Sequence, residues 1–281
     1  MNCAWHALLS VLPVWMRQNL DNYKDNLQEL RLRLDMPAEI VAQGVNTWLD
    51  RAISVDDLRF CINAASQYSP WAADTVRYGY LTCPGGHRIG ICGEAIYEKD
   101  NLKGIRIPTS LCIRVSRDFP DMPLHKIPLT GSVLIIGRPG CGKTTLLRNI
   151  IRRKSNTVSG GIAVIDERRE IFPYYRNTSC FLPGKRTDIL TGCKKTHGID
   201  MALRCLGPAT IAIDEITAEE DCKALIRAGW CGVDLIATAH AGCTADLLER
   251  EIYTPILKSK LFHTLVVLHE DKSWNVERLD V

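Results

Sequence analysis

The chain has 281 residues, of which 46% are hydrophobic and 24% are charged, and its formal net charge is +3. This composition is typical of folded domains and excludes a disordered chain, and the length allows two domains with separate cores. The small net charge does not by itself indicate nucleic-acid binding. No run reaches the roughly 18 apolar residues of a membrane span. The N-terminus has no positively charged segment before its apolar run, so we expect a cytoplasmic protein without a secretory signal.

The N-terminal region predicts a helix, a strand and a second helix. Apolar residues between Trp5 and Leu20 follow a helical stripe that Pro13 interrupts, and we expect this stripe to pack on the N-terminal domain. Docking on a membrane or a partner helix is the alternative. Residues 27–34 alternate apolar and charged side chains, which indicates a half-buried strand, and we expect it at a sheet edge. Ser54 is placed to cap a helix over residues 56–66.

Further along, residues 78–97 contain two apolar runs around a Pro-Gly-Gly turn, which predicts a β-hairpin. Residues 111–117 predict another strand. His87 and Arg88 beside the turn are the only functional candidates in this half. A position at an exposed hairpin tip would explain these two residues about equally well.

Residues 118–130 contain three prolines among polar residues, so they continue neither a helix nor a central strand. We interpret them as a linker. The expected organisation is an N-terminal α+β domain over residues 1–117, this linker, and a second domain over residues 131–281.

The second domain opens with a phosphate-binding loop. A buried strand at Val133–Ile136 is followed by Gly-Arg-Pro-Gly-Cys-Gly-Lys-Thr, which fits the G-x-x-x-x-G-K-[ST] pattern, and then by a helix that starts at Lys143. Backbone N–H groups, the lysine and the positive end of the helix dipole favour the phosphates of ATP, and Thr144 is expected to ligate Mg²⁺. The expected nucleotide-binding residues are Gly137, Arg138, Pro139, Gly140, Cys141, Gly142, Lys143, Thr144 and Thr145.

The 12 cysteines include no C-x-x-C pair and no zinc-finger spacing with histidine. We expect free thiols in a reducing compartment. Cys141 lies at a helix N-terminus, where a thiol pKa is lowered, so it is either oxidation-prone or simply a small residue that fits the loop.

Two later strands end in acidic residues. Residues 161–171 place Asp166 and Glu167 at the carboxyl end of a buried strand, where open α/β sheets bind ligands, although an acidic surface turn has the same composition. Residues 209–217 form a Walker B strand. Phosphoryl transfer needs a carboxylate that holds Mg²⁺ through water and a second one that orients or deprotonates the attacking water. We assign these roles to Asp214 and Glu215.

The last predicted strand, residues 233–240, ends with Thr238 and His240, where a sensor of the γ-phosphate is expected. Strands alternate with expected helices at residues 143–153, 199–205 and 218–228. This alternation predicts an α/β fold with a mainly parallel sheet.

Basic residues cluster at two places in this domain. We interpret the first cluster as a solvated helix face, and the alternative is a track for a nucleic-acid backbone. The clusters are Arg148, Arg152, Arg153 and Lys154, and Lys185, Arg186, Lys194 and Lys195.

With these motifs placed, the C-terminal half resembles the RecA-like ATPases of type II and type IV secretion and pilus retraction. Those carry an Asp box, a Walker B motif and a His box in this order, which here fall on Asp166 and Glu167, on Glu215 and on His240. They usually have glycine before the Walker B glutamate, whereas this chain has Asp214, as in the broader RecA-like ATPases. The candidate catalytic residues are therefore Glu215, Glu167, Lys143 and His240, and the candidate Mg²⁺ ligands are Thr144, Asp214 and Asp166.

Nearly the whole chain resembles the stage III sporulation AA family of endospore-forming bacteria. The strings that carry this resemblance are ELRLRL, YGYLTCPGGHRIGICGEA, LCIRVSRD, VIDERREI, KRTDIL, the stretch around Lys195 to Gly198, LRCLGPATIAIDEI and LIATAH. The resemblance implies a cytoplasmic ATPase of the mother cell that works with membrane proteins of its own operon in a secretion-like channel complex at the forespore membrane. It also implies a hexameric ring that draws an arginine from a neighbouring subunit. The candidates are Arg204, Arg168, Arg106 and Arg114.

Three functions follow as hypotheses. The first is an ATPase motor in which Glu215 is the base. The second is a RecA-like ATPase acting on nucleic acid, which the small net charge disfavours. The third is a nucleotide-gated scaffold with negligible turnover, which has no need for the acid pair Asp214 and Glu215.

Overall fold

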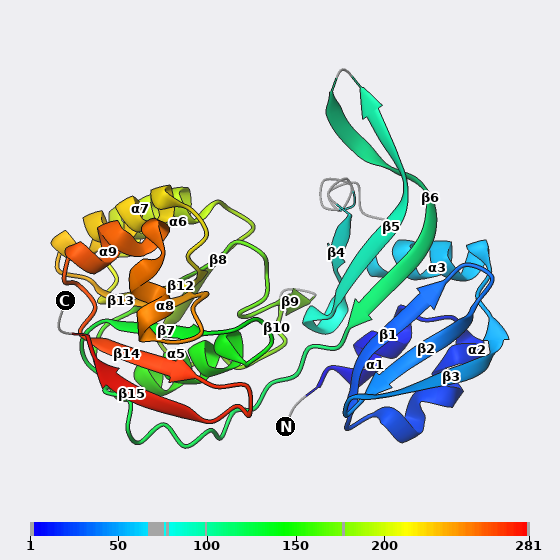
Figure 1. Cartoon of the computed structure of the whole chain (residues 1–281), viewed down its shortest axis with the longest axis horizontal. Coiled ribbons are helices and arrows are strands. Elements are labelled where there is room, and N and C mark those ends of the chain that lie inside the picture. Colours follow the sequence, from blue (N-terminus) through cyan, green and yellow to red (C-terminus); the bar gives the residue numbers. More distant parts are fainter. Residues whose placement is uncertain (1–2, 67–75, 77–78, 99, 176–177, 280–281) are drawn as a thin grey trace. The chain divides into compact units, whose positions relative to one another are not determined.

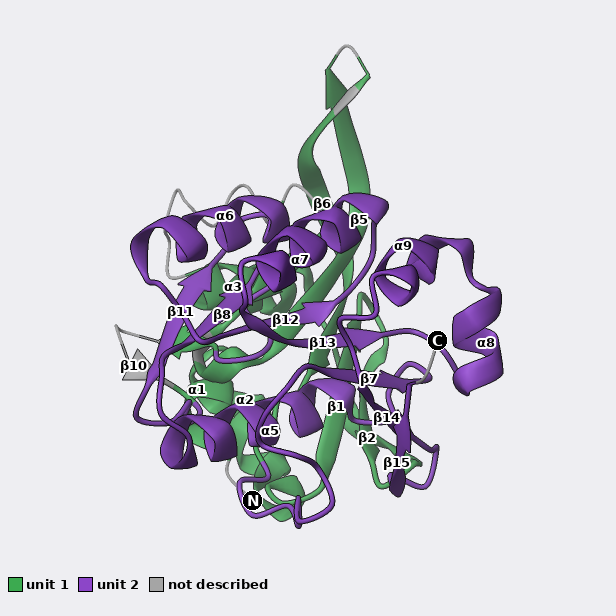
Figure 2. Ribbon diagram, turned by 90° about the vertical axis from the view of Figure 1, so that its left-hand side faces the viewer, with its two compact units in different colours: residues 1–118, 173–180 green, residues 119–172, 181–281 purple. Residues whose placement is uncertain are grey.

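The computed structural model describes residues 3–66, 76, 79–98, 100–175 and 178–279. The chain divides into two compact units, which Figure 2 colours separately. Unit 1 comprises residues 1–118 and 173–180, and unit 2 comprises residues 119–172 and 181–281. Unit 2 thus begins inside the segment predicted as a linker, and a short segment of the C-terminal half belongs to unit 1.

Unit 1 is built on a six-stranded antiparallel sheet of order β3-β2-β1-β6-β5-β4 (Figure 1). Helices α1, α2 and α3, short 3₁₀ turns and a small β9–β10 hairpin complete it. The bounds are α1 Trp5–Ser10, α2 Val14–Arg17, η1 Gln18–Tyr23, β1 Leu27–Arg33, β2 Pro37–Ala42, β3 Val45–Ala52, α3 Val55–Ser66, β4 Tyr80–Thr82, η3 Pro84–Gly86, β5 Arg88–Glu98, β6 Asn101–Arg114, β9 Tyr174–Tyr175 and β10 Thr178–Ser179.

The N-terminal stripe packs within unit 1, as predicted. Its apolar side chains at Trp5, Leu8 and Leu12 are buried in the same cluster as the sheet, and Pro13 separates α1 from α2. The predicted cap of α3 is also confirmed, because the Ser54 hydroxyl accepts the Asp57 N–H at 3.1 Å and the Asp57 carboxylate accepts the Ser54 N–H at 3.0 Å.

Strand β1 lies inside the sheet, so the expected edge position is wrong. It pairs with β2 on one side and with β6 on the other. Leu30 and Leu32 on its inner face are fully buried, while Arg31 on the other face pairs with Glu29 at 2.8 Å. The alternation therefore reports a sheet with one solvated face, which a central antiparallel strand shows as well as an edge strand.

The predicted hairpin around the Pro-Gly-Gly turn is present, but His87 is not at an exposed tip. His87 is fully buried, its Nδ1 accepts the Ser116 N–H at 3.1 Å, and its Nε2 lies 3.2 Å from the Ala4 carbonyl oxygen. Burial lowers the pKa of His87 from 6.5 to about 4. This histidine is a neutral structural residue of unit 1.

Unit 2 is the predicted α/β fold. Its seven-stranded sheet has the order β11-β8-β12-β13-β7-β14-β15, in which only β15 is antiparallel to its neighbour (Figure 1). The bounds are β7 Val133–Gly137, α5 Lys143–Thr157, β8 Ile162–Asp166, β11 Thr187–Thr191, α6 Lys195–Cys205, β12 Thr210–Glu215, α7 Glu219–Trp230, β13 Asp234–Ala239, α8 Thr244–Glu249, η4 Glu251–Tyr253, α9 Thr254–Lys258, β14 Thr264–Leu268 and β15 Trp274–Arg278.

Helices cover both faces of this sheet. Helices α6 and α7 lie on one face and α5 on the other (Figure 2). Leu134 and Ile136 of β7 pack in one apolar cluster with Ile199 of α6 and Leu225 of α7. Because β7, β8, β12 and β13 are parallel, their carboxyl ends lie at one edge of the sheet, where the predicted site residues gather.

Three of the four residues of the first basic cluster are buried, so its interpretation as a solvated helix face is wrong. The Arg148 guanidinium lies 4.6 Å from the centroid of the Phe181 ring, and Arg152 donates to the Leu182 carbonyl at 2.7 Å. Lys154 pairs with Asp234 at 2.7 Å. Each of these long side chains thus carries its charged group to a partner within unit 2, which the sequence pattern alone does not reveal.

Candidate active site

The loop between β7 and α5 has the backbone that a phosphate loop requires. Gly140 and Gly142 adopt positive φ angles of 79° and 106°, which disfavour side chains. A Cβ atom at Gly137 would lie 2.5 Å from the sulfur of Cys141, which is buried in the loop. Lys143 begins α5, and its ammonium donates to the Gly137 carbonyl at 2.8 Å. The loop therefore curls around its own lysine.

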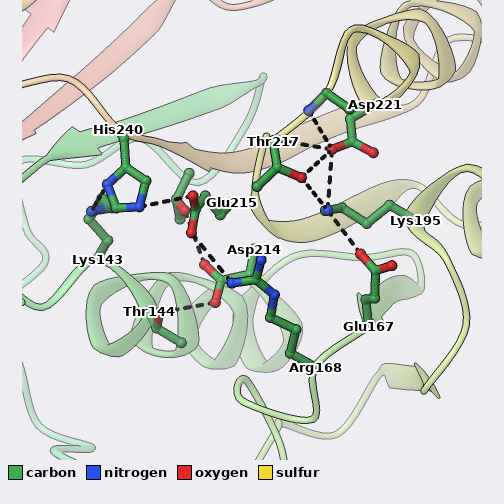
Figure 3. Close-up of polar contacts among 12 residues, drawn as sticks. Lys143, Thr144, Glu167, Arg168, Lys195, Asp214, Glu215, Thr217, Asp221 and His240 are labelled. Atoms are coloured by element: carbon green, nitrogen blue, oxygen red, sulfur yellow. Dashed lines mark hydrogen bonds and ion pairs between the residues drawn. The ribbon is translucent and has the colours of Figure 1, made fainter. Parts of the chain in front are cut away.

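Lys143 is joined to Glu215 through His240 (Figure 3). The Lys143 Nζ lies 3.1 Å from the His240 Nδ1, and the His240 Nε2 lies 2.9 Å from a Glu215 oxygen. Lysine has no acceptor, so it donates to Nδ1, and Nε2 carries the proton that faces Glu215. Burial lowers the pKa of Lys143, and the negative charges of Glu215 and Asp214 act in the opposite direction.

Asp214 receives a hydroxyl donor on each carboxylate oxygen. Thr144 donates to one oxygen at 3.0 Å, and the buried Thr238 donates to the other at 3.0 Å. Among the described residues no group of three or more His, Cys, Asp or Glu side chains forms a metal site. The hard oxygen donors of Thr144 and Asp214 nevertheless fit Mg²⁺, which uses one or two carboxylates together with phosphate oxygens.

Asp166 holds the backbone that follows β8. Its carboxylate accepts the N–H groups of Glu170 at 2.8 Å, Ile171 at 3.0 Å and Phe172 at 2.9 Å. It is 1% exposed, and burial raises its pKa although the three N–H groups act to lower it. Both oxygens of this candidate metal ligand are thus engaged by backbone donors.

Glu167 lines a small pocket together with Asp166 and the two acids of β12. This pocket is lined by Ile165, Asp166, Glu167, Arg168, Lys195, Asp214 and Glu215. The Glu167 carboxylate lies 2.9 Å from the Lys195 ammonium (Figure 3). Lys195 also lies 3.2 Å from Asp221 and donates to the Thr217 hydroxyl at 3.1 Å.

The four candidate arginines lie in different surroundings. Arg168 lies 3.8 Å from Glu215 in its own chain. Arg106 and Arg114 belong to unit 1, where they pair with Glu94 and Glu29. Arg204 is exposed on α6. Of the four arginines, Arg168 is therefore the one that the structure places beside an acidic residue of the pocket.

Comparisons with known proteins show where this chain belongs. The family described as sporulation stage III, protein AA, matches residues 6–277. The chain belongs to this family. A relative, the stage III sporulation protein AA of Bacillus subtilis (strain 168), is 31% identical over 95% of this chain and 92% of its own length. An uncharacterized ycf45 protein of Porphyra purpurea is 26% identical over 92% of this chain but only 44% of its own length.

Solved structures share the fold of this sporulation-family chain. The ATPase DotB of Legionella pneumophila has a TM-score of 0.61 at 19% identity, covering 95% of this chain and 80% of its own. The pilus retraction motor PilT, solved with bound ADP, has a TM-score of 0.61 at 15% identity, covering 92% and 77%. The predicted fold, a RecA-like α/β unit with a preceding α+β unit, is confirmed. Within the described part of the chain, no helix has both the length and the apolar character to cross a membrane.

Sequence reasoning misses three residues that organise this edge of the sheet. Lys195 falls in a cluster of basic residues by sequence, although it is 7% exposed and opens α6 earlier than the helix predicted at residue 199. Asp221 is absent from the predicted site. Tyr253 is also absent from the predicted site, although its hydroxyl accepts the His240 N–H at 3.1 Å. Lys195 and Tyr253 contact partners that are distant in sequence, so no local motif assigns them to the site, whereas Asp221 accepts the N–H groups of Thr217 and Ala218 at the start of its own helix.

Proposed function

We propose that this sporulation-family protein hydrolyses ATP at the carboxyl edge of the unit 2 sheet. The observation that carries the proposal is the contact of the phosphate-loop residues with the two acids of β12. Thr144 contacts Asp214, and Lys143 reaches Glu215 through His240. The ATPase fold of the solved neighbours supports it.

In the proposed reaction, the backbone N–H groups of residues 137–145 and the Lys143 ammonium bind the phosphates of ATP. Thr144 and Asp214 hold Mg²⁺, which neutralises charge on the phosphates. Glu215 accepts a proton from the water whose oxygen attacks the γ-phosphorus, while the bond to the bridging oxygen breaks and ADP leaves. His240 contacts one Glu215 oxygen, and the other oxygen, which lies 3.8 Å from the Arg168 guanidinium, would accept the proton of the water.

The remaining candidates take supporting roles in this proposal. Glu167 completes the acidic wall of the pocket, and Asp166 fixes the backbone behind it. Arg168 is placed to neutralise charge at Glu215 in the same subunit. The arginine that a neighbouring subunit contributes to this site is then Arg204, Arg106 or Arg114.

We further propose that the protein is a homo-hexamer that acts at the mother-cell face of the forespore membrane, attached through membrane proteins of its own operon. Family membership and the pilus-motor fold support this role. The small net charge and the burial of three of the four residues in the first basic cluster favour it over action on nucleic acid.

Turnover of purified protein, measured against protein concentration with size analysis, tests the function. We expect activity to rise with assembly, Lys143→Ala to lose nucleotide binding, and Glu215→Gln to bind ATP while turnover falls by about 10²–10⁴-fold. Robust hydrolysis by Glu215→Gln removes the base role. Binding without turnover or assembly at any concentration, with or without DNA, favours the scaffold instead.

A further inference from the structure

Lys195 is a buried lysine whose three N–H donors all have partners. Its ammonium lies 2.9 Å from Glu167, 3.1 Å from the Thr217 hydroxyl and 3.2 Å from Asp221. The side chain is 8% exposed. A buried ammonium is costly unless it is paired and hydrogen-bonded, so this arrangement fixes the positions of its partners.

The partners come from three segments that meet at the Lys195 ammonium (Figure 3). Glu167 directly follows β8, and Thr217 lies just beyond Glu215 at the end of β12. Asp221 in the first turn of α7 accepts the N–H of Thr217 at 3.0 Å and that of Ala218 at 3.3 Å. Lys195 therefore joins the segment that carries Glu167 to the segment that carries Glu215.

We propose that Lys195 is a positioning residue for the reaction, which holds the Glu167 carboxylate in the pocket beside Asp214 and Glu215. This inference rests on the proposed ATPase function. With its donors taken by Glu167, Thr217 and Asp221, Lys195 does not bind the nucleotide. It acts on the reaction through Glu167.

Lys195→Met removes the ammonium and keeps an apolar stem of similar length. Lys194→Met is the matched control, because Lys194 is the exposed neighbour at the start of the same helix. We expect Lys195→Met to lower kcat by roughly 10²-fold with KM for ATP nearly unchanged, since small displacements of a reacting geometry have effects of this size. The control keeps wild-type kcat. An unchanged kcat in Lys195→Met overturns the proposal.

A double-mutant cycle separates positioning from general damage. If Lys195 acts through Glu167, the double variant Lys195→Met/Glu167→Gln has the same kcat as Glu167→Gln alone. If the two losses multiply, Lys195 acts independently of Glu167 and the proposal fails. If Lys195→Met does not fold, Lys195→Arg is the second variant. It keeps the positive charge but displaces Glu167, so we expect kcat to fall at constant KM. A wild-type kcat in Lys195→Arg rejects the positioning role.

Amide hydrogen exchange distinguishes a failed inference from a failed function, because it needs no turnover. We expect faster exchange in residues 167–172 and 216–221 of Lys195→Met than in Lys194→Met, with or without bound ATP. Equal exchange in both variants overturns the positioning role. If the wild-type protein binds ATP and turns none over, the ATPase function fails while the exchange comparison still decides whether Lys195 orders these segments.

Discussion

The two units differ in what their buried polar side chains contact, and the histidines show the difference best. In unit 1, His87 is fully buried and both ring nitrogens face backbone groups. In unit 2, the His240 side chain is 32% exposed, and its nitrogens face Lys143 and Glu215. The residue type is the same, but one ring satisfies the backbone of an antiparallel sheet and the other joins ionisable groups at the edge of a parallel sheet. Partners and exposure therefore separate a structural histidine from a functional candidate.

Among the variants that test this comparison, the largest effect should come from Asp214, which lies at the same edge of the unit 2 sheet as His240. Asparagine keeps the shape but has one acceptor oxygen, so it cannot accept from both Thr144 and Thr238, and it brings no charge to a cation. We expect Asp214→Asn to lower ATP turnover by about 10²–10³-fold. Turnover across a Mg²⁺ titration measures it, with Asp188→Asn, an exposed acid on β11, as the control. Equal turnover in both variants would show that the hydroxyl contacts of Asp214 are only structural.

His87 should affect stability rather than turnover. Its pKa is about 4 in the folded chain against an ordinary value of 6.5, so between these pH values the unfolded chain binds more protons. The contribution of His87 to the free energy of unfolding is therefore fully present above pH 6.5 and is lost as the pH falls toward 4. The total loss is about 3 kcal/mol. His87→Leu should flatten the slope of stability against pH over this interval, whatever its effect on stability at neutral pH.

Urea unfolding at several pH values, followed by tryptophan fluorescence, measures that slope. The matched control is His6→Leu, which removes an exposed histidine from the same unit. An NMR titration of the His87 ring is the direct check. A ring that protonates near pH 6.5, its ordinary value, in the folded protein contradicts the structural role of His87.

His240 provides the opposite case, in which turnover changes and stability does not. The Nε2 proton of His240 faces Glu215, so removal of the His240 ring frees the Glu215 carboxylate to move. We expect His240→Ala to lower kcat by about 10–10²-fold, and His240→Gln, which keeps an N–H donor, to lose less. The exposed His263 of the same unit provides the control variant His263→Gln. A loss of stability in His240→Ala as large as in His87→Leu would remove the distinction between the two histidines.

The same contrast explains how much the sequence predicts. The phosphate loop, the strand ending in Asp214 and Glu215 and the strand before His240 are contiguous motifs, and parallel strands bring their carboxyl ends together. The α/β fold could therefore be predicted. Lys195 and Tyr253 could not, because their contacts depend on the packing of α6 and η4 rather than on spacing. The predicted edge position of β1 is wrong because alternation reports one solvated face, not the number of neighbouring strands.

The basic cluster of α5 is the smallest test of this comparison. The sequence pattern predicts a solvated Lys154, yet its side chain is 6% exposed and lies 2.7 Å from Asp234, which also accepts the Gly131 N–H at 3.1 Å. Lys154→Met keeps the apolar stem and removes the charged partner, so we expect the free energy of unfolding to fall by about 2 kcal/mol. Lys185→Met, at an exposed lysine of the same unit, should change it by less than about 0.5 kcal/mol.

Salt separates a buried pair from a surface pair in this last test. Exposed charges are screened at high ionic strength, whereas buried pairs are screened much less. The difference between wild type and Lys154→Met, measured by urea unfolding, should therefore persist at about 1 M salt. If the difference vanishes, or if Lys154→Met and Lys185→Met behave alike, the cations of α5 interact with solvent as the sequence pattern indicates. A persistent difference instead means that this charge of α5 stabilises unit 2, in contrast to the charges at the carboxyl edge of the sheet, which we propose bind the nucleotide.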